Sequence, residues 1–377
     1  MRGRTLTSRK PQVASGNRHY RIAIIGAGAV ARMHAAALND LENATLVAAS
    51  CRTEEKGKQF SEEFGAAWYA DYDVMLSQEK PDVACICTPS GAHLEPAIAC
   101  AKRGVHIVCE KPLEITSERI KKMVNSAKRA HVMVGGIFPQ RFNPVMQALH
   151  DAAAENRFGH LSTVNCYVPW WRDDEYYAPD RWQGTQELDG GGALINQSIH
   201  MIDAMQWLAG ATMPYLSRGV NPVEEVFAYT ACRGHDPGLI EVEDTGVAIV
   251  RFRSGALGQI LGATSMYPGS YRRVQLAGRD GTAEVIEDRL ATWQFRDDQP
   301  EDEEIRKRFN KQADTHGGGA NPMDFDHANH TRNIASFLES LDEGKRPPLD
   351  GIESRKAVAI IEAIYESART GESVSVK

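Results

Sequence analysis

The chain has 377 residues, of which 42% are hydrophobic and 25% charged. This is the composition of a globular protein long enough for two domains, and it excludes disordered, collagen-like and disulfide-scaffold classes. The formal net charge is -7, and the basic residues are dispersed, which argues against a nucleic-acid or anionic-membrane surface. Seven cysteines without Cys-x-x-Cys spacing favour a reducing, cytoplasmic setting.

Residues 1–18 are basic, and the first acidic side chain in the sequence is Asp40. This segment lacks the apolar centre of a signal peptide. We expect a disordered leader here, and the alternative is an arm that reaches across a partner subunit. No apolar run in the chain approaches the ~18 residues of a membrane-spanning helix.

Between residues 19 and 140, short apolar runs alternate with helical stretches. The runs are almost uninterrupted, as in strands that are covered on both faces; they lie at 21–25, 45–49, 83–87 and 105–109. Helix candidates follow around 29–40, 54–64, 95–103 and 116–130. This alternation predicts a doubly wound parallel sheet, that is, a Rossmann domain over 19–140.

The alternation stops after residue 140. A helix-like stretch at 189–209 is followed by long β-rich segments at 223–231, 244–264 and 271–287, and an amphipathic helix precedes Gly371. Residues 141–377 therefore predict a second, α+β domain with a large, mostly antiparallel open sheet. We expect the charged, Gly-rich segment 296–326 to be an exposed excursion.

A glycine-rich turn directly follows the first strand. Gly26, Gly28 and Ala31 match the G-x-G-x-x-A dinucleotide fingerprint, in which the glycines permit a tight turn and close approach of a pyrophosphate. Ala29 and Val30 open the helix whose positive end would face that group. Such a turn can be merely structural, but its place in a βαβ series predicts dinucleotide binding.

The end of the second strand bears on the choice between NAD and NADP. Residues 50–53 are Ser-Cys-Arg-Thr, without the strand-end carboxylate that binds the ribose of NAD. Ser50 and Arg52 would suit a 2′-phosphate. The alternative is that Arg52 lies in solvent and Glu54 or Glu55 binds the ribose. The pattern favours NADP over NAD.

Two further strand ends carry polar residues that should line the same crevice, because ligands bind at the carboxyl ends of such strands. Thr88 and Pro89, with His93 behind them, follow one strand, and Glu110 and Lys111 follow the next. Lys111 precedes a proline, an unusual position for a lysine. The alternative for it is an ordinary surface lysine at a strand exit.

The stretch 189–209 combines three glycines with a narrow polar stripe. On a helix, Asn196, His200 and Asp203 recur at i, i+4 and i+7 among apolar residues. His200 can be a satisfied core residue or a catalytic base, since an ordinary histidine pKa is ~6.5. Trp170 and Trp182 can stack on sugar faces, with ordinary packing as the alternative.

We expect no metal site. His327 and His330 have i, i+3 spacing near Asp324 and Asp326, but the run is typical of a solvated helix start and offers no clear partner to hydrogen-bond and orient the ligating side chains.

These motifs together resemble the glucose-fructose oxidoreductase/inositol dehydrogenase (Gfo/Idh/MocA) family in order and spacing. The resemblance covers about residues 20–377 and rests on the fingerprint, Thr88-Pro89 with His93, Glu110-Lys111-Pro112, Arg141 with Pro144, Trp182, Asp189 with its three glycines, and the polar stripe. It implies a Rossmann domain, a C-terminal open sheet that carries the substrate pocket, and NAD(P)-dependent redox chemistry on a sugar or cyclitol. It also implies a homo-oligomer, a dimer or tetramer assembled through the C-terminal sheet.

Mapped onto this chain, the family's catalytic lysine is Lys111 and its histidine is His200. The commonly acidic partner one turn earlier is Asn196, which can orient a hydroxyl but cannot take a proton. Base work then falls to His200, with Lys111 assisting and both contacting substrate. Arg141 is expected at the cofactor, and Gln183 replaces the arginine of the family's Trp-Arg pair.

The expected reaction is hydride transfer between nicotinamide and a secondary hydroxyl or keto carbon of a sugar, sugar derivative or cyclitol. One alternative is a glycosidase of the same family that recycles its cofactor, and a less favoured one is a cofactor-sensing regulator without catalysis.

Overall fold

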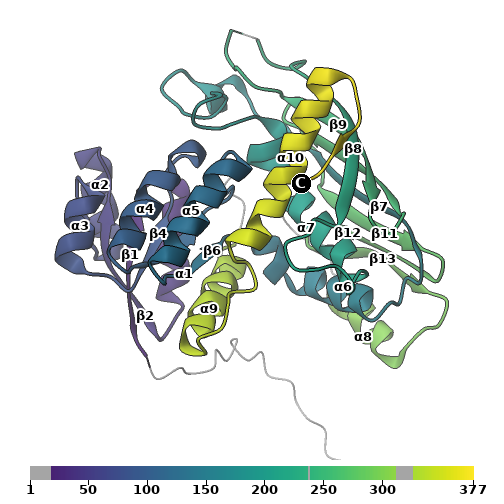
Figure 1. The fold of residues 1–377 in the computed structure, drawn as a ribbon, viewed down its shortest axis with the longest axis horizontal. Helices are drawn as coiled ribbons and strands as arrows, with labels where there is room; N and C mark the ends of the chain where they lie inside the picture. Colours follow the sequence, from purple (N-terminus) through teal and green to yellow (C-terminus); the bar gives the residue numbers. More distant parts are fainter. Residues whose placement is uncertain (1–17, 237, 311–325) are drawn as a thin grey trace, which may run out of the picture.

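The computed structural model describes residues 18–236, 238–310 and 326–377. The expected leader lies outside these residues except for Arg18. Residues 311–325 of the excursion expected at 296–326 also lie outside them. Two β-sheets stand at opposite ends of the molecule, and helix α10 (Gly351–Thr370) runs between them (Figure 1).

The first sheet has six parallel strands in the order β3-β2-β1-β4-β5-β6. The strands are β1 (Tyr20–Ile25), β2 (Ala44–Ser50), β3 (Ala67–Tyr69), β4 (Val83–Ile86), β5 (His106–Cys109) and β6 (Val134–Gly136). They alternate with α1 (Ala29–Asn39), α2 (Glu54–Phe64), α3 (Tyr72–Glu79), α4 (Leu94–Lys102) and α5 (Ser117–Arg129). The order reverses between β1 and β4, which is the switch point where such sheets bind ligands.

Strand β1 shows why the strands of the first sheet appear in the sequence as almost uninterrupted apolar runs. Ile22 and Ile24 belong to one buried apolar cluster, whereas Ala23 and Ile25 point to the opposite face and belong to another. From Ile22 to Ile25 both faces of the strand therefore exclude water, and the side chains there must be apolar.

The second sheet has eight strands in the order β13-β12-β11-β7-β10-β9-β8-β14, and only its β7–β10 pair is parallel. The strands are β7 (Leu161–Pro169), β8 (Val223–Ala231), β9 (Thr245–Phe252), β10 (Leu257–Ala263), β11 (Arg273–Gly278), β12 (Gly281–Ile286), β13 (Arg289–Phe295) and β14 (Val374–Ser375). The long segment expected at 244–264 is a hairpin that turns at Gly255, whose φ of 87° suits glycine. The predicted fold class is confirmed.

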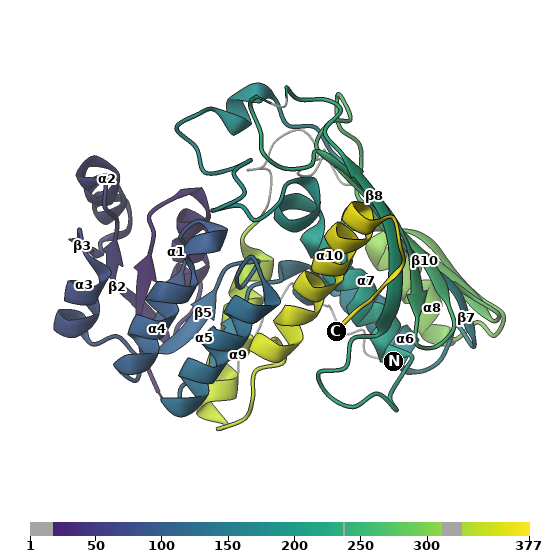
Figure 2. The ribbon, with the colours of Figure 1, turned by 45° about the horizontal axis from the view of Figure 1, so that its top comes forward.

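The helices of the second domain cover one face of its sheet. α7 (Ile199–Ala211) packs on β7 and β11, and α10 packs on β8, so both lie on the side that faces the first domain (Figure 2). α6 (Pro144–Ala154) packs against α7, and α8 (Pro300–Phe309) lies on β13.

Helix α9 (Ala328–Asp342) comes late in the chain but packs against α1. Its Ile334, Phe337 and Leu338 join the same apolar cluster as Ile22 and Ile24. The chain thus returns to cover one face of the first sheet (Figure 1). Of the helices formed by the described residues, none has the length and apolarity needed to cross a membrane.

Candidate active site

A cavity of about 1410 Å³ lies at the carboxyl ends of β1, β2, β4 and β5 and extends to the second domain. It is lined by most of the site residues predicted from the sequence, namely Gly26, Gly28, Ala29, Val30, Ser50, Arg52, Thr88, Pro89, Glu110, Lys111, Trp170, Trp182, Asn196 and His200. Three predicted cofactor residues, Ala31, His93 and Arg141, are not among its lining residues.

The glycine turn fits a dinucleotide. Gly26 has a φ of 100°, and a Cβ there would lie 2.6 Å from the backbone oxygen of Cys87, so only glycine allows the turn to pack against β4. A Cβ on Gly28 would meet no atom within 4 Å, and this space opens at the N-terminus of α1, where no side chain caps the helix. Its first-turn amides can therefore bind a pyrophosphate. Ala31 is buried in the same apolar cluster as Ile22 and Ile24 of β1.

The end of β2 presents positive charge to the cavity. Ser50 is buried, whereas Arg52 is exposed at the cavity wall. Lys56, on the first turns of α2, lines the same wall. The sequence reasoning did not single out Lys56, although it lies one helical turn after Arg52.

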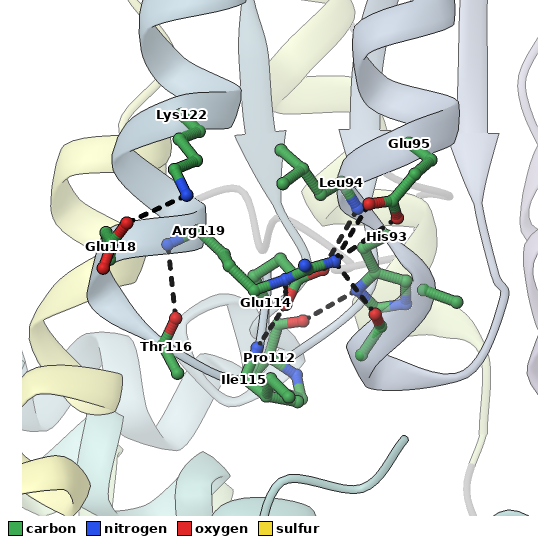
Figure 3. Close-up of polar contacts among 12 residues, drawn as sticks. His93, Leu94, Glu95, Pro112, Glu114, Ile115, Thr116, Glu118, Arg119 and Lys122 are labelled. Atoms are coloured by element: carbon green, nitrogen blue, oxygen red, sulfur yellow. Dashed lines mark hydrogen bonds and ion pairs between the residues drawn. The ribbon is translucent and has the colours of Figure 1, made fainter. Parts of the chain in front are cut away.

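The loop that carries Lys111 is pinned to the start of α4 (Figure 3). The peptide bond between Lys111 and Pro112 is cis. The two ring nitrogens of His93 lie 2.9 Å from the backbone oxygens of Pro112 and Thr88. His93 therefore lies buried behind the cavity and holds two of its strand-end loops together, and the prediction that it contacts the cofactor has no support in its position.

Glu114 completes this anchor (Figure 3). Its carboxylate is fully buried and accepts hydrogen bonds from the backbone nitrogens of Leu94 at 3.1 Å and Ile115 at 2.8 Å. The guanidinium of Arg119 donates to it at 2.9 Å. A buried carboxylate requires hydrogen-bond donors of this kind, and these contacts fasten the loop after β5 to the start of α4, close to Lys111.

Glu110 lies between two histidines. The Nε2 of His34 is 2.8 Å and the Nε2 of His330 is 3.7 Å from its Oε1. Burial alone would raise the pKa of Glu110, but the hydrogen bond and charge of His34, with contributions from His330 and Lys111, lower that pKa to about 2. Glu110 is thus an anion directly beside the lysine.

The histidine run near the start of α9 differs from its expectation as a solvated helix start. His330 is only 8% exposed, because α9 packs on α1 and brings it to His34 and Glu110. His327 is solvated, and its Nε2 lies 3.1 Å from a carboxylate oxygen of Asp40. Asp324 lies outside the described residues.

Lys111 reaches across the cavity to the second domain. Its Nζ donates a hydrogen bond of 2.8 Å to the backbone oxygen of Asn196. Burial lowers the pKa of Lys111, and the charge of Arg172 acts in the same direction, while Glu110 and Asp189 partly offset them. The lysine can therefore lose its proton more easily than a solvated one.

The helix predicted over 189–209 starts later in the structure than in the prediction. Residues Ala193–Ser198 form a π-helical turn, and α7 starts only at Ile199. The wider turn changes the register, so the expected stripe divides: Asn196 and His200 line the cavity, but Asp203 does not. π-Helical turns are frequent at functional sites.

Arg141 pairs with Asp203 instead of reaching the cavity. Its Nε and one terminal nitrogen each lie 2.6 Å from an Asp203 carboxylate oxygen, and its other terminal nitrogen is 3.1 Å from Glu353. The pair is fully buried, where a guanidinium requires such partners. Arg141 therefore joins α7 to α10. It was expected at the cofactor, but it does not line the cavity.

His200 lies at the cavity with its ring edge-on to Phe138. Burial, followed by the nearby charge of Lys111, holds the pKa of His200 well below the ordinary value of 6.5. The ordinary histidine pKa, from which a base was predicted, therefore does not apply to His200. At neutral pH the imidazole is therefore uncharged and free to accept a proton, but it is a weaker base than expected.

A polar network forms the second-domain end of the cavity. Arg172 donates to Gln197 at 2.8 Å, and its guanidinium lies 5.1 Å from the ring centroid of Trp170. Gln197 in turn donates to the hydroxyl of Tyr176 at 2.8 Å. Arg172 and Tyr176 could be associated with Trp170 from the sequence, because they follow it closely, whereas their partner Gln197 is a tertiary neighbour that was not singled out.

A two-domain, dinucleotide-binding oxidoreductase is the class that this fold and cavity define. The family model described as "Oxidoreductase family, NAD-binding Rossmann fold" matches residues 20–138, and the one described as "Oxidoreductase family, C-terminal alpha/beta domain" matches residues 152–376. The chain belongs to the Gfo/Idh/MocA oxidoreductase family, an NAD-dependent dehydrogenase family that acts on sugar hydroxyls. The predicted family and enzyme class are confirmed.

Three similar proteins illustrate the family. The WlbA dehydrogenase of Bordetella pertussis, solved in complex with NADH and UDP-GlcNAcA, is 30% identical, with a TM-score of 0.84 over 96% of this chain and 99% of that one. The D-glucoside 3-dehydrogenase of Escherichia coli is 30% identical over 63% of this chain and 68% of its own. The myo-inositol 2-dehydrogenase of Thermotoga maritima is 24% identical over 95% and 98%, respectively.

Proposed function

We propose that this protein transfers a hydride between nicotinamide and a secondary hydroxyl or keto carbon of a sugar, sugar derivative or cyclitol. The observation that carries the proposal is that Lys111 from the first domain and His200 from the second line one cavity, which also contains the glycine turn. The similar proteins are named for a cyclitol or a glucoside, or were solved with a sugar nucleotide, which supports this substrate class.

The nicotinamide supplies the hydride acceptor or donor when it is bound. The neutral imidazole of His200 accepts the hydroxyl proton during oxidation and returns it during reduction. Lys111 donates a hydrogen bond to the developing alkoxide, a kind of electrostatic help worth about 2.7–4 kcal/mol per donor. Asn196, Trp170 and Trp182 orient the sugar at the second-domain wall.

We also propose that the protein prefers NADP(H). The support is Arg52 with Lys56 behind it at the cavity wall, two cations where a strand-end carboxylate would select NAD. The neighbour solved with NADH makes NAD the alternative that the binding experiment must separate.

We propose further that the protein is a cytoplasmic homo-oligomer assembled through the second sheet. All seven cysteines are free, as a reducing compartment requires. Strands β8 to β10 expose large apolar residues on the face away from the helices: Tyr229, Val247, Ile249 and Leu257. An apolar face of this kind is typical of a subunit interface.

The proposed reaction is tested by monitoring nicotinamide absorbance with NAD and NADP against a panel of sugars, sugar acids, sugar nucleotides and cyclitols. A Lys111→Met variant is the negative control. The proposal expects substrate-dependent reduction that the variant loses. Release of a free sugar without net reduction would instead identify the glycosidase, and cofactor binding without turnover of any panel member would favour the regulator.

A further inference from the structure

We propose that Glu243 is a positioning residue of the active site, which holds the start of the π-helical turn Ala193–Ser198 and thereby fixes the contact between Asn196 and Lys111. The inference rests on the proposed function, in which Asn196 and Lys111 both contact the substrate. Glu243 lies two residues before β9 and does not line the cavity. It can therefore influence the reaction only through the residues that it holds.

Three successive backbone amides at the start of this turn donate to Glu243. The nitrogens of Gly192 and Leu194 each lie 2.9 Å from the carboxylate, at Oε2 and Oε1, respectively. The nitrogen of Ala193, between them, lies 3.0 Å from the backbone oxygen of Glu243. A single residue, 51 positions after Gly192 in the sequence, thus binds all three amides.

These amides need an acceptor from outside the turn. The first amides of a helix have none within it, and Gly192, which precedes the turn, has no side chain that could supply one. A carboxylate is a favourable acceptor at this end because the aligned peptide dipoles leave positive charge there. Glu243 therefore supplies the contacts that define where the turn begins.

Glu243 approaches the turn closely, and its carboxylate is itself held. A Cβ on Gly192 would collide with the backbone oxygen of Glu243, and a Cβ on Gly191 would collide with the hydroxyl of Tyr365. That hydroxyl donates a 3.0 Å hydrogen bond to Oε1 of Glu243. The two glycines thus allow α10, which carries Tyr365, and the segment before β9 to pack directly against the turn.

A continuous chain of hydrogen bonds connects Glu243 to Lys111. Gly192 donates to Oε2 of Glu243, and its own backbone oxygen accepts from the nitrogen of Asn196 at 3.0 Å. The backbone oxygen of Asn196 in turn accepts from Nζ of Lys111 at 2.8 Å. The side chain of Asn196 is held separately, by a 2.6 Å hydrogen bond to Oδ1 of Asp189. Glu243 therefore sets the position of the Asn196 backbone relative to Lys111.

The experiment measures both ends of this chain in the full-length protein. Hydrogen–deuterium exchange follows the amides of residues 192–194, and acetic anhydride at fixed pH measures how readily Lys111 reacts, relative to the exposed Lys345. In Glu243→Ala we expect faster exchange of these amides, and a labelling rate of Lys111 that rises by about 2–10-fold, the range for loss of one hydrogen bond. If either rate is unchanged, the proposal is overturned.

Asp350→Ala is the matched control. Asp350 binds the first amides of α10, those of Ile352 and Glu353, at 3.0 Å, and it does not line the cavity. The control removes the same kind of contact from another helix of the second domain, so it should leave the labelling of Lys111 unchanged. An equal rise in both variants means that the domain has loosened in general, which overturns the proposal.

Tyr365→Phe decides the question if Glu243→Ala does not fold. It removes only the hydroxyl that binds Oε1 of Glu243. We therefore expect both rates to rise in the same direction, with a labelling rate about twofold above that of the wild type, the lower end of the range for one hydrogen bond. Unchanged rates in this variant then overturn the proposal.

Kinetics with an active substrate separate positioning from a purely structural role. Glu243→Ala should lower kcat by about 10–100-fold, because displacement of reacting groups by about 1 Å can cost 10²-fold, while the cofactor Kd stays unchanged. Glu243→Gln retains one acceptor oxygen and should restore part of kcat. An unchanged kcat in Glu243→Ala overturns the proposal. Exchange and labelling need no turnover, so a wild type without turnover refutes the proposed function alone.

Discussion

The two sheets bury their residues in different ways, and the difference determines which work each can do. Strands of the first sheet are covered on both faces, which leaves only their carboxyl ends for ligands. In the second sheet, Ala248 and Val250 of β9 are buried while Val247 and Ile249 between them are exposed. One face thus packs on helices and the other is available to a partner.

The candidate site combines the two arrangements. The first sheet supplies groups from loops at its strand ends, where the glycine turn and Lys111 lie. The second domain supplies His200 and Asn196 from a helix that packs on the inner face of its sheet. For the proposed reaction, this arrangement predicts that binding of the cofactor and handling of the proton are separable by mutation.

The largest effect is expected from removing the proposed base, His200 of the second domain. His200→Ala should lower turnover by about 10²–10⁴-fold, the range for a lost general base, while cofactor affinity is preserved because the glycine turn lies in the other domain. Steady-state kinetics and cofactor titration measure both quantities. His150→Ala is the control, since His150 stacks on Trp207 outside the cavity. Near-normal turnover in His200→Ala would exclude His200 as the base.

The next effect concerns a buried ion pair that belongs to the second domain alone. Asp302 is fully buried and binds both terminal nitrogens of Arg157 at 2.6 Å, the indole nitrogen of Trp293 at 2.6 Å and the backbone nitrogen of Gln299 at 2.7 Å. Removing one partner of such a pair typically costs about 3–5 kcal/mol. Asp302→Asn should lower the free energy of unfolding by this amount at pH 7, measured by urea denaturation.

The pH dependence of this effect has a definite sign. Burial alone would raise the pKa of Asp302, but its hydrogen bonds to Arg157, Gln299 and Trp293 hold it far below the usual value. Its contribution is therefore present above an unfolded pKa of ~3.9 and is lost as the pH falls through the folded value. Wild type and variant should converge on acidification. Asp298→Asn, at an exposed pair with Arg306, should change stability by about 0–1 kcal/mol.

The first domain's specificity for its cofactor is expected to show a smaller effect. Arg52→Ala should weaken NADP(H) far more than NAD(H), because only a 2′-phosphate offers the guanidinium a charge-assisted hydrogen bond, worth about 1.5–3 kcal/mol. This corresponds to about 10–150-fold in affinity. Fluorescence titration with both cofactors measures it, with Lys58→Ala on helix α2 as control, because Lys58 is exposed and does not line the cavity. Equal losses, or a wild-type preference for NAD, would refute the NADP proposal.

Local patterns in the sequence predicted the first sheet better than the second domain. Buried parallel strands form uninterrupted apolar runs, so the fingerprint and Lys111 could be placed at strand ends. Strand β7 and helix α6 were not anticipated, although the buried residues of β7 alternate along the strand and those of α6 recur at helical spacing. The two sheets were nevertheless assigned to the correct fold class.

The sequence pattern did not predict which side chains distant in the chain contact each other in the fold. Arg141 pairs with Asp203, 62 residues away, and burial of both groups, which no local spacing reveals, decides that contact. The hydrogen bond between Asp189 and Asn196 depends on the three glycines at 190–192 and on the π-helical turn that follows them. A regular helix drawn through these residues would have separated the two side chains along its axis.

The smallest effect on stability, but one that tests the comparison directly, is expected at strand β9. Ile249 is 59% exposed and its neighbour Ala248 is 2% exposed. Ile249→Lys should change the free energy of unfolding of the subunit by no more than about 0.5 kcal/mol, as surface substitutions do, and yet reduce the mass of the assembly, because a lysine cannot be desolvated in an apolar interface. Sedimentation velocity measures the mass, and thermal unfolding at low concentration measures stability.

Ala248→Lys places the same charge on the inner face and should prevent folding. If Ile249→Lys retains the wild-type mass, the outer face of the sheet does not form the subunit interface.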